Sequence, residues 1–271
     1  MLEIPKKHET ANPRETIRDP AEKLKQCIES ISQGFHAEAI PIDRWCRIKM
    51  QPFRDVSPEE CQRDIKWVES YLRDWYGTAE QHEIEKSALE KDGEKLELLK
   101  TAVLYKNLGQ KCIIVRSSLY DDIKNGVDNI LLNRATGEII CVFDEVGDTT
   151  GVEYETKKRK ILEKNIQAGG ATIKYGIGFR REEDRVVVGL QKIEHVPIFY
   201  LALPPHIIRR GLQNLDPHRE KSTAYEKQLY HYFVAVLDLQ IKSLELSPPV
   251  TLHPQIKRRI AAFRTIVENV D

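Results

Sequence analysis

Hydrophobic residues recur at helical spacing in the first and last thirds of the chain. Asp19-Pro20 and the capping box Ser57-Pro58-Glu59-Glu60 each place a cap and a proline at a predicted helix start. Helical spacing is also seen near residues 94–106, 207–212, 223–246 and 254–267. The pattern predicts helices on both sides of the centre of the chain. Residues 1–18 are polar and aperiodic, and we expect them to form a flexible arm.

Short apolar runs typical of strands fill the centre of the chain. Turn residues separate them, except where a basic helical segment intervenes at residues 156–167. The predicted strands are residues 112–115, 127–132, 138–143, 171–179, 185–190 and 196–203. We expect one mixed sheet over residues 111–203, in which the second and third runs pair as a hairpin and the basic helix crosses over one face.

The predicted fold class is therefore α/β (α+β), with a central mixed β-sheet, a crossover helix and flanking N- and C-terminal helices. The order of elements lacks the regular alternation of a doubly wound fold or a (βα)8 barrel. We divide the chain into the arm at residues 1–18, a helical region at 19–107, an α/β core at 108–204 and a helical region at 205–271 that packs on the core.

Composition narrows the class of protein. Of the 271 residues, 41% are hydrophobic, and 42 basic residues balance 42 acidic ones. This balance argues against disorder over the whole chain and against a generally basic nucleic-acid coat protein. The five cysteines form no CxxC pair, and residues 1–8 contain no apolar signal segment. We therefore expect reduced thiols, no structural zinc and a cytoplasmic protein, and we expect no membrane partner because no apolar run is long enough to span a bilayer.

Charge is unevenly placed within this neutral chain. Residues 121–155 hold nine acids and two bases, and residues 156–181 hold eight bases and one acid. The basic block begins with the run Lys157-Lys158-Arg159-Lys160 and continues at Lys164. Lys157, Lys158, Lys160 and Lys164 are candidates for binding nucleic-acid phosphates, with affinity supplied by counterion release. The alternative is an ordinary solvated helix face.

Two acids in the acidic block have positions that suggest a metal site. Asp128 opens one strand of the predicted hairpin, and Asp144 closes the other. Because antiparallel strands joined by a short turn bring opposite ends together, we expect these carboxylates within about 4–6 Å of each other. Converging carboxylates suit Mg²⁺, or alternatively Mn²⁺, and such an ion can activate water for phosphoryl transfer. The alternative is that the acids serve local turn structure.

The order of strand, Gly126-Val127-Asp128-Asn129-Ile130-Leu131, turn, Ile139 to Val146, helix and strand resembles the PD-(D/E)xK nuclease core. That resemblance covers about residues 94–179. It implies a core of helix, three-stranded meander, helix and strand. Its first acid matches Asp128, and its second matches Asp144, or Glu145 if the register shifts by one. It also implies that an acid of the preceding helix, such as Glu97, assists the metal.

The family's lysine follows its second acid by two residues, where this chain has Val146 or Gly147. The resemblance implies that the lysine has migrated to the following helix, where Lys157, Lys160 or Lys164 can serve, or that catalysis is lost. Our leading hypothesis is a Mg²⁺-dependent nuclease with Asp128, Asp144, Glu145 and Lys160 as catalytic residues and Asp128 and Asp144 as metal ligands. The alternatives are an inactive nuclease fold that serves as a binding or assembly module, and an unrelated α/β protein with structural acids.

Overall fold

The computed structural model describes residues 19–268 apart from residues 79, 81–82, 85–86, 88, 147–148, 183–184, 219–220 and 247–251. The predicted arm at residues 1–18 therefore lies outside the described residues, as does Gly147. The described helices are α1 (Pro20–Ala37), α2 (Pro58–Tyr76), α4 (Asp92–Leu108), α5 (Leu119–Asn125), α6 (Gly151–Ile166), α7 (Pro205–Asn214), α8 (Ala224–Leu246) and α9 (Pro254–Glu268). None of these helices is both long and apolar enough to cross a lipid bilayer.

The main sheet has four strands in the order β1 (Cys112–Arg116), β2 (Asn129–Asn133), β3 (Ile139–Val146) and β6 (Ile198–Ala202). The pairs β1–β2 and β2–β3 are antiparallel, and β3–β6 is parallel. The predicted mixed sheet and its β2–β3 hairpin are thus confirmed. Because β3 and β6 are parallel, the chain has to cross over between them, and α6 lies in that connection.

The remaining two strands do not join this sheet, so the prediction of one sheet over residues 111–203 is wrong. Strands β4 (Ala171–Glu182) and β5 (Arg185–Val196) form a separate two-stranded sheet. They are adjacent in sequence and pair antiparallel from Ala171↔Val196 to Glu182↔Arg185. In such a long hairpin, the backbone N–H and C=O groups between the two strands bond to each other. The place beside β3 is occupied by β6.

Local capping explains where several helices begin and end. The side chain of Ser57 accepts a hydrogen bond from the Glu60 N–H, as the capping box predicts, and α2 ends at Gly77 with a φ of 73°. Helix α5 was not predicted from the sequence. Its signals are present nonetheless, because Ser118 accepts from the Asp121 N–H at its start and Gly126 has a φ of 58° at its end.

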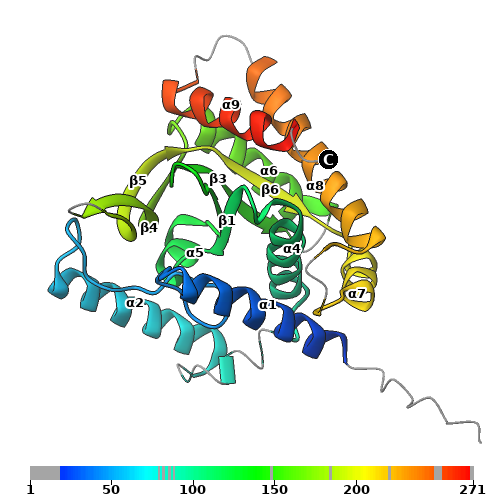
Figure 1. The fold of residues 1–271 in the computed structure, drawn as a ribbon, viewed down its shortest axis with the longest axis horizontal. Coiled ribbons are helices and arrows are strands. Elements are labelled where there is room, and N and C mark those ends of the chain that lie inside the picture. The colour runs from blue at the N-terminus through cyan, green and yellow to red at the C-terminus, as the bar shows by residue number, and fades with distance from the viewer. Residues whose placement is uncertain are drawn as a thin grey trace, which may run out of the picture.

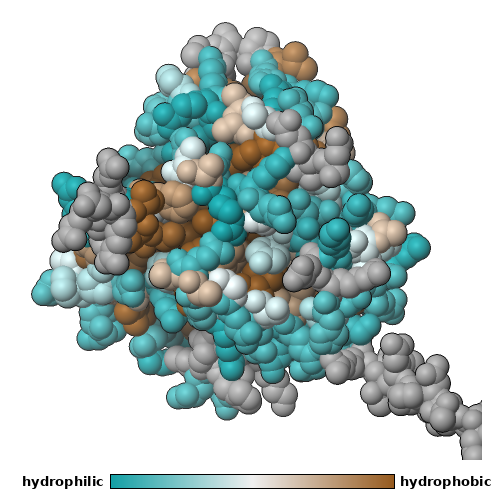
Figure 2. Space-filling view, in the orientation of Figure 1, coloured by the Kyte–Doolittle hydropathy of each residue, from teal (hydrophilic) through white to brown (hydrophobic). Residues whose placement is uncertain are grey.

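Helices α1, α4, α7, α8 and α9 share one hydrophobic core with the main sheet, whereas the buried residues of α2 lie in two smaller clusters. In Figure 1, α1 and α2 (blue and cyan) lie on one side of the sheet, and α9 (red) lies on the other. Helix α4 packs on β1 and β3, whereas α6 and α8 pack on β6. Figure 2 shows hydrophobic residues gathered over the β4–β5 hairpin on a face that is otherwise mostly hydrophilic. Charged side chains cluster at one edge of the main sheet. This edge is formed by the ends of β1, β2 and β3 that lie near α4, α5 and α6.

Candidate functional site

Asp128 and Asp144 are brought together by the register of the β2–β3 hairpin. Asn129 pairs with Phe143, and the Asp128 N–H donates to the Phe143 carbonyl at 2.8 Å. The same register continued by one residue sets Asp128 opposite Asp144, and opposite residues of an antiparallel pair share a face. Burial first, and then the charge of Asp144, raise the pKa of Asp128 well above its usual range. The two carboxyl groups therefore share one poorly solvated environment.

Lys157 of α6 is the lysine that meets these acids. Its Nζ forms an ion pair with Asp144 and donates to the Glu145 carbonyl. Burial alone would lower the pKa of Lys157, but Asp144 and Asp128 together raise it. The ammonium therefore stays charged at neutral pH beside the two carboxylates.

The other candidate lysines differ in their surroundings. Lys164 donates to the Asn125 carbonyl, and its charge also reaches Asp144. Lys158 and Lys160 are exposed, and Lys158 lies 3.5 Å from a carboxylate oxygen of Glu155. The structure records no ion pair for Lys160 within the described residues. The position beside the acids that we assigned from the sequence to Lys160 is occupied by Lys157.

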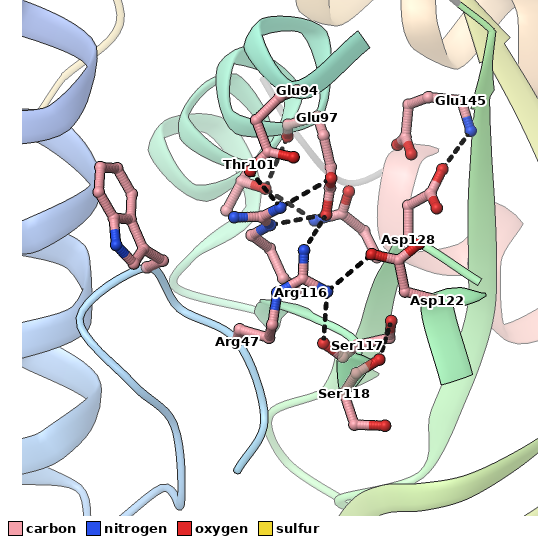
Figure 3. A network of polar contacts seen from close by, with 12 residues as sticks. Arg47, Glu94, Glu97, Thr101, Arg116, Ser117, Ser118, Asp122, Asp128 and Glu145 are labelled. Carbon is pink, nitrogen blue, oxygen red and sulfur yellow. Dashed lines mark hydrogen bonds and ion pairs between the residues drawn. The ribbon is translucent and has the colours of Figure 1, made fainter. Parts of the chain in front are cut away.

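Glu145 reaches toward α4 rather than α6. Its carboxylate contacts Nζ of Lys100, which is fully buried. Burial lowers the pKa of Lys100 to about 7. Glu145 is itself 7% exposed, and its Oε2 has no hydrogen-bond partner among the described residues. The backbone N–H of Glu145 donates to Oδ2 of Asp128 at 2.5 Å, which ties this residue to the aspartate pair (Figure 3).

Two arginines also contact acidic side chains in this region, as Figure 3 shows. Arg116, at the end of β1, contacts both carboxylate oxygens of Glu97 at 2.6 and 2.8 Å and Glu94 at 2.6 Å. Arg47 lies 2.9 Å from Asp122 and 3.7 Å from Glu97. Glu97, the acid that the resemblance implies as a metal helper, is thus engaged by both arginines. Burial would raise its pKa, but Arg116 and Arg47 lower it.

Sequence reasoning missed the cationic members Arg47, Lys100 and Arg116. A signal existed for two of them. Lys100 interrupts an apolar helical stretch, Leu98 to Val103, and Arg116 directly follows the apolar strand run. A charged residue at such a position is buried only when it is paired. Arg47 carried no signal, because it lies in a connection between α1 and α2.

These residues surround a cleft of about 540 Å³, lined by Asp128, Glu145, Lys157 and the Arg–Glu cluster. The aromatic residues Trp45, Tyr71, Trp75 and Tyr76 line it as well. We call the following ten residues the charge network: Arg47, Glu94, Glu97, Lys100, Arg116, Asp122, Asp128, Asp144, Glu145 and Lys157.

The sequence assigned a Mg²⁺ or Mn²⁺ site to the carboxylates of Asp128 and Asp144. In the described part of the chain, no group of three or more His, Cys, Asp or Glu side chains is arranged to hold a metal. Mg²⁺ does not require such a cage, because it keeps several waters and commonly binds one or two carboxylates together with substrate phosphates. Asp128 has no ion pair among the described residues, and the hairpin register sets it opposite Asp144.

The chain was compared with protein families, curated proteins and solved structures. No family model matches it. No curated protein and no solved structure matches it either.

Proposed function

We propose that this protein is a metal-dependent nuclease that hydrolyses phosphodiester bonds of nucleic acid in the cleft. The observation that carries the proposal is the contact between Lys157 and Asp144, with Asp128 opposite Asp144 in the hairpin. The ammonium of Lys157 contacts Asp144, and the charge of Asp128 also acts on Lys157. The order α4, antiparallel β1–β2–β3, α6 and parallel β6 supports the resemblance to the PD-(D/E)xK core, although α5 lies between β1 and β2. The strand beside β3 is β6 and not the segment at residues 171–179, where the resemblance was expected to end.

Each residue has a distinct task in this proposal. Asp128 and Asp144 would hold the metal ion, which supplies an activated water and stabilises charge on the phosphoryl group. Lys157 holds Asp144 in place and offsets negative charge that develops on the phosphate oxygens. Glu145 fixes Asp128 through its backbone N–H, while its buried carboxylate contacts Lys100 of α4. The Arg47–Glu97–Arg116 cluster fixes the ends of β1 and α4 around them.

A cytoplasmic location and a nucleic-acid partner belong to the same proposal. All five cysteines are free and buried, which is typical of proteins in a reducing compartment. Lys158 and Lys160 are exposed on the helix that supplies Lys157 to the cleft. They support contact with phosphates next to the site.

The test is hydrolysis of fluorescently labelled single-stranded and duplex DNA and RNA with Mg²⁺, Mn²⁺ or EDTA. We expect cleavage with either metal and none with EDTA. Asp128→Asn and Asp144→Asn should each lower the rate at least about 100-fold, because each removes a charged ligand of the metal. Asp238→Asn is the matched control, since Asp238 pairs with Lys242 on α8 away from the cleft. Cleavage that persists in EDTA or in Asp128→Asn would refute the mechanism.

The second candidate is a nuclease fold that binds nucleic acid without cleaving it. Val146 favours it, because this apolar residue stands two positions after Asp144, where the family has its lysine. Isothermal calorimetry separates the two candidates. The nuclease predicts Mg²⁺ or Mn²⁺ binding that Asp128→Ala abolishes. The binding module predicts no metal-dependent heat but retained affinity for nucleic acid.

A further inference from the structure

Helix α2 exposes three aromatic side chains on one side. Trp67, Tyr71 and Trp75 are 37%, 39% and 63% exposed. Their spacing of four residues stacks them along the helix. The ring centroids of Trp67 and Tyr71 lie 6.1 Å apart, and those of Tyr71 and Trp75 lie 6.2 Å apart with planes only 7° from parallel. We call these three residues the aromatic ladder.

Residues outside the ladder supply the buried face of α2, although Trp67 also contacts the ring of Tyr120 on α5 with the centroids 5.7 Å apart. Cys61, Val68 and Leu72 are the buried residues of the helix, and they supply its inward face. Large aromatic side chains left in water cost free energy without adding to the core. A row of them beside a cleft is typical of a surface that binds a ligand.

The ladder is continuous with the proposed active cleft. Tyr71 and Trp75 line the same cleft as Asp128, Glu145 and Lys157. Lysines lie at both ends of the ladder. Nζ of Lys124 is 5.3 Å from the ring centroid of Trp67, and Nζ of Lys91 is 5.3 Å from that of Trp75. A ligand on the ladder therefore meets flat rings along its length, a cation at each end and the acids at the cleft.

We propose that the aromatic ladder binds single-stranded nucleic acid by stacking its bases and so leads one strand into the cleft. The ligand class rests on the proposed function. Stacking requires exposed base faces, which single strands offer and duplexes hide. Helix α2 carries five acids and three bases, so phosphate attraction along the helix is weak. Stacking therefore supplies the affinity at the ladder itself.

The test is fluorescence anisotropy of the full chain with labelled oligothymidylate of about 20 nucleotides in EDTA, where cleavage cannot occur. We expect Trp75→Ala and Tyr71→Ala each to weaken binding about 5- to 150-fold, the range that loss of one stacked base gives. Trp75→Phe keeps a ring face and should recover most of the affinity. Tyr232→Ala is the matched control, because Tyr232 is 42% exposed on α8 and should leave binding unchanged.

Several outcomes would refute the proposal that the aromatic ladder binds single-stranded nucleic acid. They are equal affinity for duplex and single strand, an unchanged affinity in Trp75→Ala, or binding of a neutral oligosaccharide in place of oligothymidylate. Failure of the proposed function looks different. If the protein binds oligothymidylate through Trp75 but never cleaves with Mg²⁺ or Mn²⁺, the binding role of the ladder is supported and the nuclease proposal is refuted. If the protein cleaves while Trp75→Ala binds oligothymidylate with unchanged affinity, the nuclease proposal is supported and the binding role of the ladder is refuted.

Discussion

Lys157 and Asp144 form an ion pair although they belong to different elements, α6 and β3. Their side chains are 30% and 13% exposed, so the pair lies at the edge of the interior rather than on the open surface. Lys157 also donates to the Glu145 carbonyl, which fixes its ammonium at the end of β3. A lysine from the helix that follows the strand can thus supply the positive charge that Val146 cannot.

Replacing Lys157 tests whether this ammonium takes part in hydrolysis. We expect Lys157→Ala to lower metal-dependent cleavage about 100- to 1000-fold, as loss of one preorganised charge-stabilising group does. At saturating enzyme, where binding no longer limits the rate, Lys158→Ala should change it by less than about twofold, because the ion pair of Lys158 is with Glu155 at 3.5 Å and not with the acids of the cleft. Single-turnover cleavage rates measure both. If both variants lost the same factor in cleavage rate, the total positive charge of α6, and not the position of Lys157, would be responsible.

Asp128 should make folding stability depend on pH. Burial and Asp144 raise its folded pKa well above the usual value of 3.8, so the folded state holds a proton that the unfolded state has lost. Its contribution to stability is therefore present below the unfolded pKa and is lost as pH rises through the folded pKa. Asp128→Asn should raise the urea midpoint near pH 8 in EDTA, and the gain should shrink toward pH 4. A larger gain at pH 4 would contradict the raised pKa.

The sequence was enough to predict the hairpin and the end-to-end relation of Asp128 and Asp144. Alternation and turn residues are local signals, and the register of a short hairpin follows from them. The same locality explains the error over β4 and β5. Strands β4 and β5 pair with each other, and β6 lies beside β3, because of competition between long-range contacts. The apolar runs in the sequence do not show which of these pairings is the more stable.

The identity of the lysine in the site was also beyond the sequence. Four lysines lie between residues 157 and 164, and all are within reach of the acidic block along the chain. Only the rotation of α6 about its axis decides that Lys157 turns toward Asp144 while Lys160 is exposed. That rotation is set by packing of buried Ile161 and Asn165, with Asn165 bonded to the backbone of Ile198.

Lys100 and Glu145 should behave as one buried unit. They are 0% and 7% exposed, and they contact each other between α4 and β3. Lys100→Met should lower the free energy of unfolding at pH 6, below the pKa of about 7 of Lys100, by about 3–5 kcal/mol, because Glu145 then keeps a buried charge without its partner. The double variant Lys100→Met with Glu145→Leu should recover most of this loss, since neither charge remains. Urea unfolding in a double-mutant cycle measures the coupling, and additive losses would show that the two side chains act independently.

The exposed lysines of α6 should add a salt-dependent term to nucleic-acid binding that the aromatic ladder lacks. Each lysine that neutralises a phosphate releases counterions, so removing one such lysine should reduce the slope of log affinity against log salt by about 0.7 on a single strand. Lys158→Gln with Lys160→Gln should therefore flatten the slope, whereas Trp75→Ala should weaken binding at every salt concentration without changing the slope. Anisotropy titrations of oligothymidylate over a range of KCl concentrations give both slopes. A slope that is unchanged in the lysine variant would remove α6 from the binding surface and leave the phosphates to be held within the cleft.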